Sequence, residues 1–370
     1  MRWVSGGFVV LGALLTAACG GGKLMVGVVL PQSGINKGYG ASLGAGIKLA
    51  LDEAVAKQSP PGIEAQYRDS LSHPEYAAKE AAELFKGGAL IVIGGATTPE
   101  AMAMIPEAEA AKRVIISPSA SKPGLAESSN LFFRTVPSDD FEAEVCADFL
   151  VTHKKAKTVL VLFQQGLYSE GLLPVFSAEV AKLGGKITDK LPIGPTDWDK
   201  AISDALAAGK PDAIFICAYG EETLAALGIV RNAKFAGLVC ATSAIDAGNV
   251  VKRAGAAGDG VFVPLVRLDT GSQQEPMKSF VARFKAANKG ATPDLFAAYG
   301  YDAALAALYA LEGVPPKDNS ELLVRLMSLG GRLGVTGKLA FDKSGNIVHH
   351  PRMHVINNGS FEDCDPSPAS

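Results

Sequence analysis

Hydroxyl-rich turns after two apolar runs are the parts of this chain best suited to hold a small ligand. Residues 117–121 (SPSAS) close one run, and the Lys-Pro-Gly that follows prevents an immediate helix. Residues 94–98 (GGATT) close another run and lead into a helix, whose free N–H groups and positive dipole end favour an anion. Hydroxyls and backbone amides hold a carboxylate or amide without reacting with it, so these turns predict a binding pocket. Thr97 or Thr98 could also be the N-cap of that helix, and the two roles are compatible.

An enzyme is the first alternative for the same serines. Ser119-Ala-Ser-Lys122 fits the S-x-x-K motif of penicillin-recognising enzymes, and residues 138–140 and 343–345 approximate the two motifs that accompany it. In those enzymes the serine opens a buried helix, whereas prolines here bracket it in a turn. Residue 138 also follows too closely for an intervening helical domain. We therefore predict a binding protein and no enzyme.

Metal and nucleotide chemistry find no support in the sequence. On a strand, His350 and His354 would share one face while His349 points away, and no carboxylate or cysteine completes a ligand set at a useful spacing. The glycine-rich segments match neither a P-loop nor a dinucleotide-binding fingerprint. We predict no metal and no cofactor.

Length, charge and cysteine spacing narrow the class of protein further. A chain of 370 residues exceeds what one hydrophobic core usually organises, so two lobes are expected. The net charge of −3 comes from scattered charges of both signs, which argues against nucleic-acid binding. Four cysteines after the N-terminal segment match no zinc pattern: Cys146, Cys217, Cys240 and Cys364. Cys217 and Cys240 could be neighbours on adjacent strands, but buried free thiols are the preferred interpretation.

The N-terminus has the pattern of an export signal. A basic residue precedes the apolar stretch 8–15, which is about half of the ~20 residues that span a bilayer. Small residues then precede Cys19, as in the lipobox of bacterial lipoproteins, although Thr16 stands where leucine is usual. An ordinary cleaved signal with an incidental cysteine is the alternative. We expect a signal peptide over residues 1–19, lipidation of Cys19, and a flexible glycine tether over 20–23.

From residue 24 onward, short apolar runs alternate with amphipathic ones. The expected strands are 24–30, 63–67, 90–93, 114–117, 158–163, 186–191, 213–217, 238–240, 261–263, 338–341 and 353–356. The expected helices are 39–56, 74–85, 99–111, 171–183, 198–207, 221–233, 247–253, 275–288, 293–311 and 320–327. Residues 132–139 and 266–270 have the character of short extended connections. Repeated strand–helix units imply α/β lobes with parallel sheets covered on both faces, whose ligands sit beyond the carboxyl ends of the strands.

Seven motifs, in order, resemble those of type I periplasmic binding proteins, and most of all the leucine/isoleucine/valine-binding branch that serves ABC importers. They are residues 27–34 (GVVLPQSG), 39–40 (YG), 91–94 (IVIG), 116–118 (ISP), 133–139 (FRTVPSD), 299–302 (YGYD) and 335–342 (VTGKLAFD). The resemblance implies two doubly wound parallel-sheet lobes joined by three crossings. It places the N-terminal lobe at 24–137 plus 268–335, the C-terminal lobe at 138–267 plus 336–361, and a tail at 362–370.

Carried over position by position, the resemblance also implies a ligand site. Its members are Tyr39, Thr97 with Thr98, Ser119, Ser121, Tyr168, Tyr219 and Phe296. In this family the hydroxyl after the third strand binds the ligand carboxylate, and here that residue is Thr97, with Thr98 as the alternative, assisted by Ser119 and Ser121. Tyr39 would cover the pocket, Tyr168 would close on the ligand, and Tyr219 or Gly220 would border it. Amino-acid binders of this type carry an acid after the strand that ends here at Cys240, and this chain has Ser243 there. Because an unpaired buried ammonium is costly, either another acid (Glu221, Glu222 or Asp246) replaces it, or the ligand is no α-amino acid.

The function implied is that of an extracytoplasmic solute-binding protein. It would bind a small amino acid of the branched-chain type, or a related carboxylate or amide, and close over it by hinge bending. Its expected partners are this small molecule, an ABC permease complex and, through Cys19, a membrane; we expect a monomer in the periplasm or at the cell surface. The alternative is a lipoprotein on the same fold that senses a ligand or regulates cell-wall synthesis.

Overall fold

Five parallel strands form the sheet of the N-terminal lobe, in the order β2-β1-β3-β4-β5. The computed structural model describes residues 23–194, 197–266, 268–313 and 319–364. The strands are β1 (Leu24–Leu30), β2 (Ile63–Asp69), β3 (Ile91–Gly94), β4 (Val114–Ser117) and β5 (Phe132–Arg134). The signal peptide and Cys19 lie outside the described residues.

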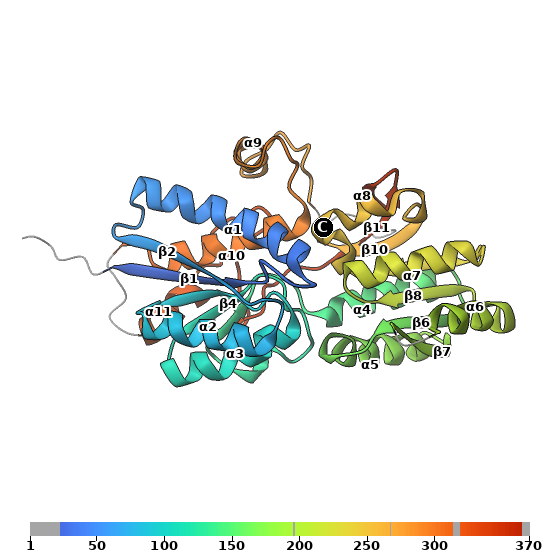
Figure 1. Cartoon of the computed structure of the whole chain (residues 1–370). Coiled ribbons are helices and arrows are strands. Elements are labelled where there is room, and N and C mark those ends of the chain that lie inside the picture. The colour runs from blue at the N-terminus through green and yellow to red at the C-terminus, as the bar shows by residue number, and fades with distance from the viewer. Residues whose placement is uncertain (1–22, 195–196, 267, 314–318, 365–370) are drawn as a thin grey trace, which may run out of the picture.

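Helices cover both faces of this first sheet (Figure 1). On one face lie α1 (Lys37–Lys57) and α10 (Leu295–Ala310), and on the other lie α2 (Pro74–Lys86) and α3 (Thr98–Ala111). The side chains of β1 show why both faces are covered. Val26, Val28 and Leu30 pack in the same cluster as α1 and α10, whereas Met25 and Val29 pack with α2 and α3. All seven residues of β1 are buried, as expected for a central strand of a parallel sheet.

The second lobe contains a seven-stranded sheet in the order β12-β11-β10-β9-β8-β6-β7. Its parallel strands are β6 (Thr158–Gln164), β7 (Lys186–Ile193), β8 (Ala213–Cys217), β9 (Leu238–Ala241) and β10 (Val261–Leu265). Two antiparallel strands, β11 (Arg352–Asn357) and β12 (Ser360–Asp363), complete the edge. The predicted fold class, two doubly wound α/β lobes, is confirmed.

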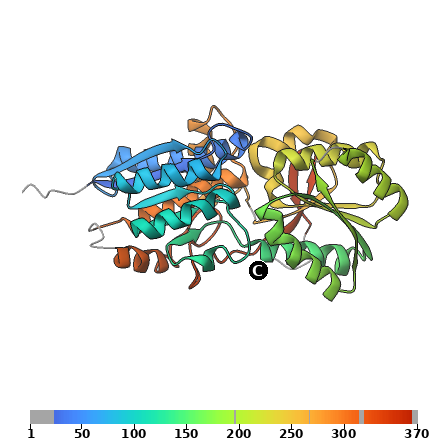
Figure 2. The same cartoon turned by 60° about the horizontal axis from the view of Figure 1, so that its bottom comes forward.

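Helices again cover both faces of the second sheet (Figure 2). One face carries α4 (Asp139–Asp148), its π-helical continuation η2 (Phe149–His153) and α5 (Leu167–Lys182). The other carries α6 (Trp198–Gly209) and α7 (Gly220–Asn232). Smaller elements are η1 (Ala126–Ser128), η3 (Ser243–Asn249), α8 (Val250–Ala254), η4 (Gly255–Ala257), α9 (Met277–Ala287) and α11 (Asn319–Met327). In the described part of the chain, no helix has both the length and the apolar character needed to cross a membrane.

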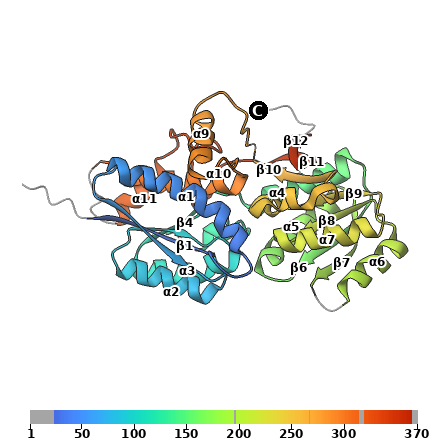
Figure 3. The same cartoon turned by 45° about the horizontal axis from the view of Figure 1, so that its top comes forward.

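Three segments pass between the lobes (Figure 3). The first leads from β5 into α4, the second leads from β10 back towards α9, and the third leads into β11. Before the third crossing, Asn346 pairs with Arg134 of β5 in a parallel bridge. The division of the lobes at residues 335/336 remains a prediction, and this bridge favours a boundary after residue 347.

Several element predictions were wrong in detail. Residues 132–139, expected to be a connection, contain strand β5 and the first residue of α4, and helix α4 itself was not predicted. The expected strand 338–341 forms isolated bridges instead, because its hairpin runs through Gly345, where φ is 92°. The expected helix 247–253 divides into η3 and α8.

Candidate functional site

The candidate site lies where the two sheets reverse their strand order. In the first lobe this reversal falls between β1 and β3, and in the second it falls between β6 and β8. Loops at the carboxyl ends of such strands form the crevice in which doubly wound folds bind ligands. Tyr39 and Thr98 follow β1 and β3, and Tyr168 and Tyr219 follow β6 and β8. The fold therefore places predicted site residues from both lobes at the two reversal points.

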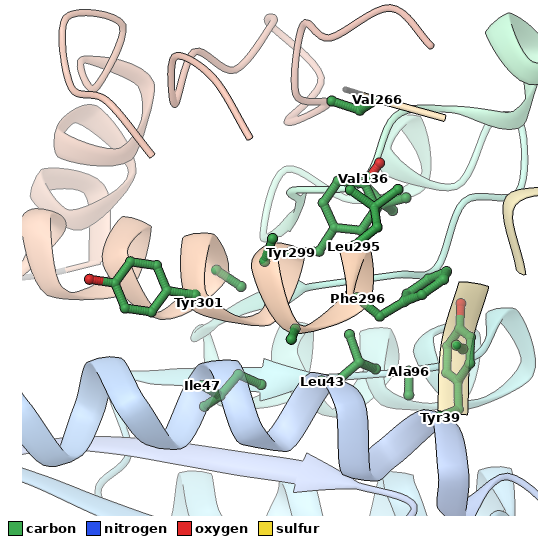
Figure 4. Close-up of a cluster of buried hydrophobic side chains, with 14 of the residues drawn as sticks. Tyr39, Leu43, Ile47, Ala96, Val136, Val266, Leu295, Phe296, Tyr299 and Tyr301 are labelled. Atoms are coloured by element: carbon green, nitrogen blue, oxygen red, sulfur yellow. The ribbon is translucent and has the colours of Figure 1, made fainter. Parts of the chain in front are cut away.

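Five aromatic rings form a chain that bridges the lobes. Phe296 packs on Tyr39, with ring centroids 4.6 Å apart, and on Tyr299 at 5.9 Å (Figure 4). Tyr39 meets Tyr219 of the other lobe edge-on at 6.0 Å. Tyr219 in turn stacks on Tyr168 at 5.0 Å, with 18° between the ring planes. The rings predicted to cover a ligand are thus in mutual contact.

Close packing of α1 against α10 fixes the first-lobe part of this ring chain. A Cβ atom built at Gly300 would lie 2.3 Å from the Leu43 carbonyl oxygen, and one at Gly46 would lie 1.8 Å from the Ala297 oxygen. Only glycine permits helices to approach this closely. Since Tyr39 lies in the first turn of α1 and Phe296 lies in the first turn of α10, the approach of the two helices sets the position of both rings.

Of the two candidate threonines, Thr98 has the hydroxyl that is available to a ligand. Thr97 is the N-cap of α3, and its hydroxyl donates to Glu100 Oε2 at 2.9 Å. Thr98 is fully buried, and its Oγ1 has no hydrogen-bond partner within the described residues. Burial raises the pKa of Tyr219, whose hydroxyl group lies near the Thr98 backbone, so the threonine borders the ring chain.

The serines of the predicted turn divide into one that shapes the loops and one that borders the cleft. Ser119 is buried, and its hydroxyl donates to the Ala96 carbonyl at 2.6 Å, which ties the two first-lobe loops together. It also lies close enough to Tyr39 to affect the pKa of that phenol. Ser121 is partly exposed, and its carbonyl accepts from the Asp139 N–H at 2.9 Å.

Two buried acids lie in the first turn of α4, one of them bonded to the segment that follows β9, and the sequence analysis did not identify them as site residues. Asp139 is 1% exposed and Glu142 is 6% exposed. Burial raises the pKa of Asp139 to about 7, against the lowering effects of the Ser121 side chain and the Arg134 guanidinium. Burial, followed by the charge of Asp139, raises the pKa of Glu142 to about 8. Burial, and to a lesser degree the charges of these two acids, raises the pKa of Tyr39 and Tyr168, so the acids lie near both tyrosines.

Ser243, which stands where an acid was expected, is bonded to one of these carboxylates. Its backbone N–H donates to Glu142 Oε1 at 2.8 Å, and its hydroxyl donates to Glu142 Oε2 at 2.7 Å. The carboxylate that α4 supplies therefore occupies the neighbourhood of the residue that follows β9. Because 101 residues separate Glu142 from Ser243, this contact could not be predicted from the spacing of neighbouring residues.

Of the three acids considered as replacements for that residue, two are engaged by other groups and the third borders the mouth of the cleft. Glu221 forms a two-pronged ion pair with Arg253 near the surface, and this contact lowers its pKa. Asp246 accepts from the Leu295 N–H at 2.7 Å and links the lobes behind the rings. Glu222 lines the mouth of the cleft with Tyr39 and Tyr219. The pocket at this mouth measures about 30 Å³, and Tyr39 and Tyr219 on its lining bring the two lobes into direct contact.

The histidines, acids and cysteines of the described residues were the candidates for a metal site or a disulfide. Within the described residues there is no group of three or more His, Cys, Asp or Glu side chains that could hold a metal ion. The four described cysteines are free, and three of them are buried. Cys217 and Cys240 lie on the adjacent strands β8 and β9, and the sulfur contact that the structure shows joins Cys240 to Cys146 of α4, with Sγ atoms 3.0 Å apart.

Comparison with known proteins assigns the family. The model of the family described as periplasmic binding protein matches residues 23–356. The chain belongs to this family, as the motif order indicated. Its relatives are binding proteins, so the chain is a binding protein rather than an enzyme, and membership implies export to the periplasm.

Two curated relatives match most of the chain. The leucine-, isoleucine-, valine-, threonine-, and alanine-binding protein of Pseudomonas aeruginosa is 25% identical over 326 residues, covering 86% of this chain and 85% of its own. A Leu/Ile/Val-binding protein homolog of Brucella abortus is 26% identical over 340 residues, covering 87% of each chain.

Solved structures show the same fold. The LivJ substrate binding protein of Streptococcus pneumoniae, in complex with isoleucine, superposes with a TM-score of 0.84 at 24% identity, covering 92% of this chain and 98% of its own. A solute binding protein of an R. palustris ABC transporter, in complex with benzoate, superposes with a TM-score of 0.83 at 21% identity, covering 93% and 96%. At these identities the likeness concerns the fold alone.

Proposed function

We propose that this protein binds a small amino acid of the branched-chain type, or a related carboxylate or amide, and delivers it to an ABC permease. The first lobe would hold the ligand carboxylate through the Thr98 hydroxyl, while Ser119 fixes the loop beside it through its bond to the Ala96 carbonyl. The second lobe would close over it with Tyr168 and Tyr219. Closure by hinge bending at the three crossings would bury the ligand and create the form that docks on the permease.

One observation carries the proposal: the Thr98 hydroxyl is fully buried and has no hydrogen-bond partner within the described residues, and Thr98 borders Tyr219 in the chain of aromatic rings that joins the lobes. A buried polar group without a partner is costly, and a ligand carboxylate would satisfy it. Aromatic rings offer apolar area to a small aliphatic side chain. The P. aeruginosa relative, named for binding leucine, isoleucine, valine, threonine and alanine, supports this ligand class.

Thermal unfolding of the purified protein in the presence of single ligands tests the proposal. A ligand that binds only the folded state stabilises it by mass action, by about 2.7 kcal/mol at a concentration 100 times Kd. We expect a raised Tm with leucine, isoleucine or valine and none with glucose. A screen of amino acids, carboxylates and amides in which no compound raises the Tm would refute the proposal.

The anchoring part of the proposal concerns Cys19. A diacylated cysteine supplies two buried chains, which is enough for stable membrane attachment. We expect the protein to fractionate with membranes, and Cys19→Ala to move it to the soluble fraction while leaving ligand binding unchanged. An ordinary cleaved signal would leave the unmodified protein soluble from the outset.

A further inference from the structure

We propose that Glu142, together with Asp139, binds the cationic end of the ligand, so that α4 supplies the negative charge that Ser243 lacks. This inference rests on the proposed function and narrows its ligand to one with both an ammonium and a carboxylate group. The acid thus comes from a helix that follows the first crossing, rather than from the loop after β9.

Hydrogen bonds hold the Glu142 carboxylate in place. The Ser243 N–H and hydroxyl donate to its two oxygens at 2.8 and 2.7 Å. Ser138 caps α4, and the positive end of the helix dipole favours acids in the first turn. These donors are neutral, so they orient the carboxylate without cancelling its charge.

Within the described part of the chain, one cation, Arg134, acts on this pair of acids. Arg134 acts on Asp139, but no cation is among the groups that shift the titration of Glu142. Asp139 Oδ2 is buried and has no hydrogen-bond partner among the described residues. The other titratable groups that interact electrostatically with the pair are Tyr39, Arg134, Asp140, Cys146, Tyr168, Cys217, Tyr219 and Tyr299. Two ionised carboxylates beside one guanidinium have a net charge of −1, which one ligand ammonium group would neutralise.

The opposite end of the site fits a carboxylate. Thr98 Oγ1 is buried and unpartnered within the described residues, and it belongs to the first turn of α3, whose dipole favours an anion. Tyr219 borders both Thr98 and Asp139. A zwitterion lying along Tyr219 would therefore meet opposite charges at its two ends, and α-amino acids have this arrangement.

Leucine and its des-amino analogue 4-methylpentanoate distinguish the inference from the function on which it rests. We expect wild type to bind leucine on the order of 100-fold more tightly than 4-methylpentanoate, because the analogue leaves the buried acids unpaired. Glu142→Gln keeps the side-chain shape and should lose a similar factor for leucine alone. The exposed Glu144, on the same helix, provides the matched control, Glu144→Gln. Calorimetry reports each affinity.

Proton release gives a readout that needs no variant. An ammonium that pairs with Glu142 makes a protonated carboxylate ionise, so leucine binding at pH 7 should release a proton. Titrations in two buffers of different ionisation enthalpy measure this release, and 4-methylpentanoate should cause none.

Leucine binding without proton release, or with affinity equal in wild type and Glu142→Gln, overturns the inference and leaves the proposed function standing. If 4-methylpentanoate binds as tightly as leucine, the site recognises only the carboxylate group of the ligand, and the inference is wrong. If no amino acid binds, the proposed function fails and this inference with it.

Discussion

Thr97 and Glu100 cap the N-terminus of α3 reciprocally. The Thr97 N–H donates to Glu100 Oε2 at 3.0 Å, and the Glu100 N–H lies 3.5 Å from Thr97 Oγ1, which accepts it. Glu100 is itself buried and accepts from the Ser70 hydroxyl. The cap commits Thr97 to the helix and leaves its neighbour Thr98 for the ligand.

Thr98→Val should therefore weaken binding without destabilising the protein. Valine keeps the shape and removes a hydroxyl that has no partner within the described residues. Losing a hydrogen bond to a charged ligand group should lower affinity on the order of 10-fold. Calorimetric titration with leucine measures the affinity, and chemical unfolding of the free protein should show no loss of stability.

Thr97→Val is the matched comparison and should behave in the opposite way. It removes the helix cap, which should cost about 1 kcal/mol of unfolding free energy. Affinity should change little by comparison. If Thr97→Val is the variant that loses binding, then Thr97 carries the ligand contact.

Stability of the unliganded protein should fall as pH rises. In the folded state the pKa of Glu142 is raised from its ordinary 4.5 to about 8. The unfolded chain releases this proton near 4.5 whereas the folded chain retains it, so stability is lost between these values and is flat above the upper one. Asp139, raised to about 7, acts in the same direction.

Unfolding midpoints measured from about pH 5 to about pH 9 check this dependence. Glu142→Gln removes one of the two titrating groups, so its stability should fall less steeply than that of wild type. Parallel curves for the two proteins would contradict the buried position of Glu142.

Gly300→Ala should destabilise the first lobe. The added Cβ would lie 2.3 Å from the Leu43 carbonyl oxygen, so α10 must move away from α1. Overpacking of this kind costs roughly 1–3 kcal/mol. Gly228→Ala provides the control, because Gly228 lies within α7 with nothing within 4 Å of its added Cβ. It should stabilise by roughly 0.5–1 kcal/mol, and equal effects of the two variants in chemical unfolding would argue against the close helix packing.

Cys146 and Cys240 should be the cysteines that pair under oxidising conditions. Their Sγ atoms lie 3.0 Å apart, and a bond of about 2.05 Å needs only a small shift. Oxidised glutathione would accept the two electrons and two protons released and yield two reduced molecules. Peptide mapping by mass spectrometry should find the 146–240 link, and Cys217→Ser should retain it. A link that includes Cys217 instead would contradict this placement.

Site residues whose contacts are with near neighbours in the sequence could be predicted, and those whose contacts join distant parts of the chain could not. The first-lobe loops follow from local patterns, because an apolar run ending in hydroxyls marks the carboxyl end of a buried strand. The T-x-x-E spacing of Thr97 and Glu100 likewise indicates the cap. The family motifs supplied the tyrosines, which the fold places at its reversal points.

Glu142 was not predicted as a site residue because the helix that contains it, α4, was not predicted. Its sequence, DDFEAEVCAD, shows little helical periodicity, and the structure continues it as a π-helix. One usable signal was present: Ser138 followed by Asp139, Asp140 and Glu142 is typical of a helix N-terminus. The contact with Ser243 was not predictable in any case, since it depends on how β9 and α4 meet in the second lobe.

Both lobes depend on the last part of the chain. The first needs α10 against its sheet and Asn346 beside β5, and the second needs β11 and β12 at its edge. A chain emerging from the ribosome therefore lacks a piece of each core until residues 346–363 have been made, although domains usually fold as units during synthesis. For a chain exported in the unfolded state, this late completion of both cores would delay folding until after most of the chain has been synthesised.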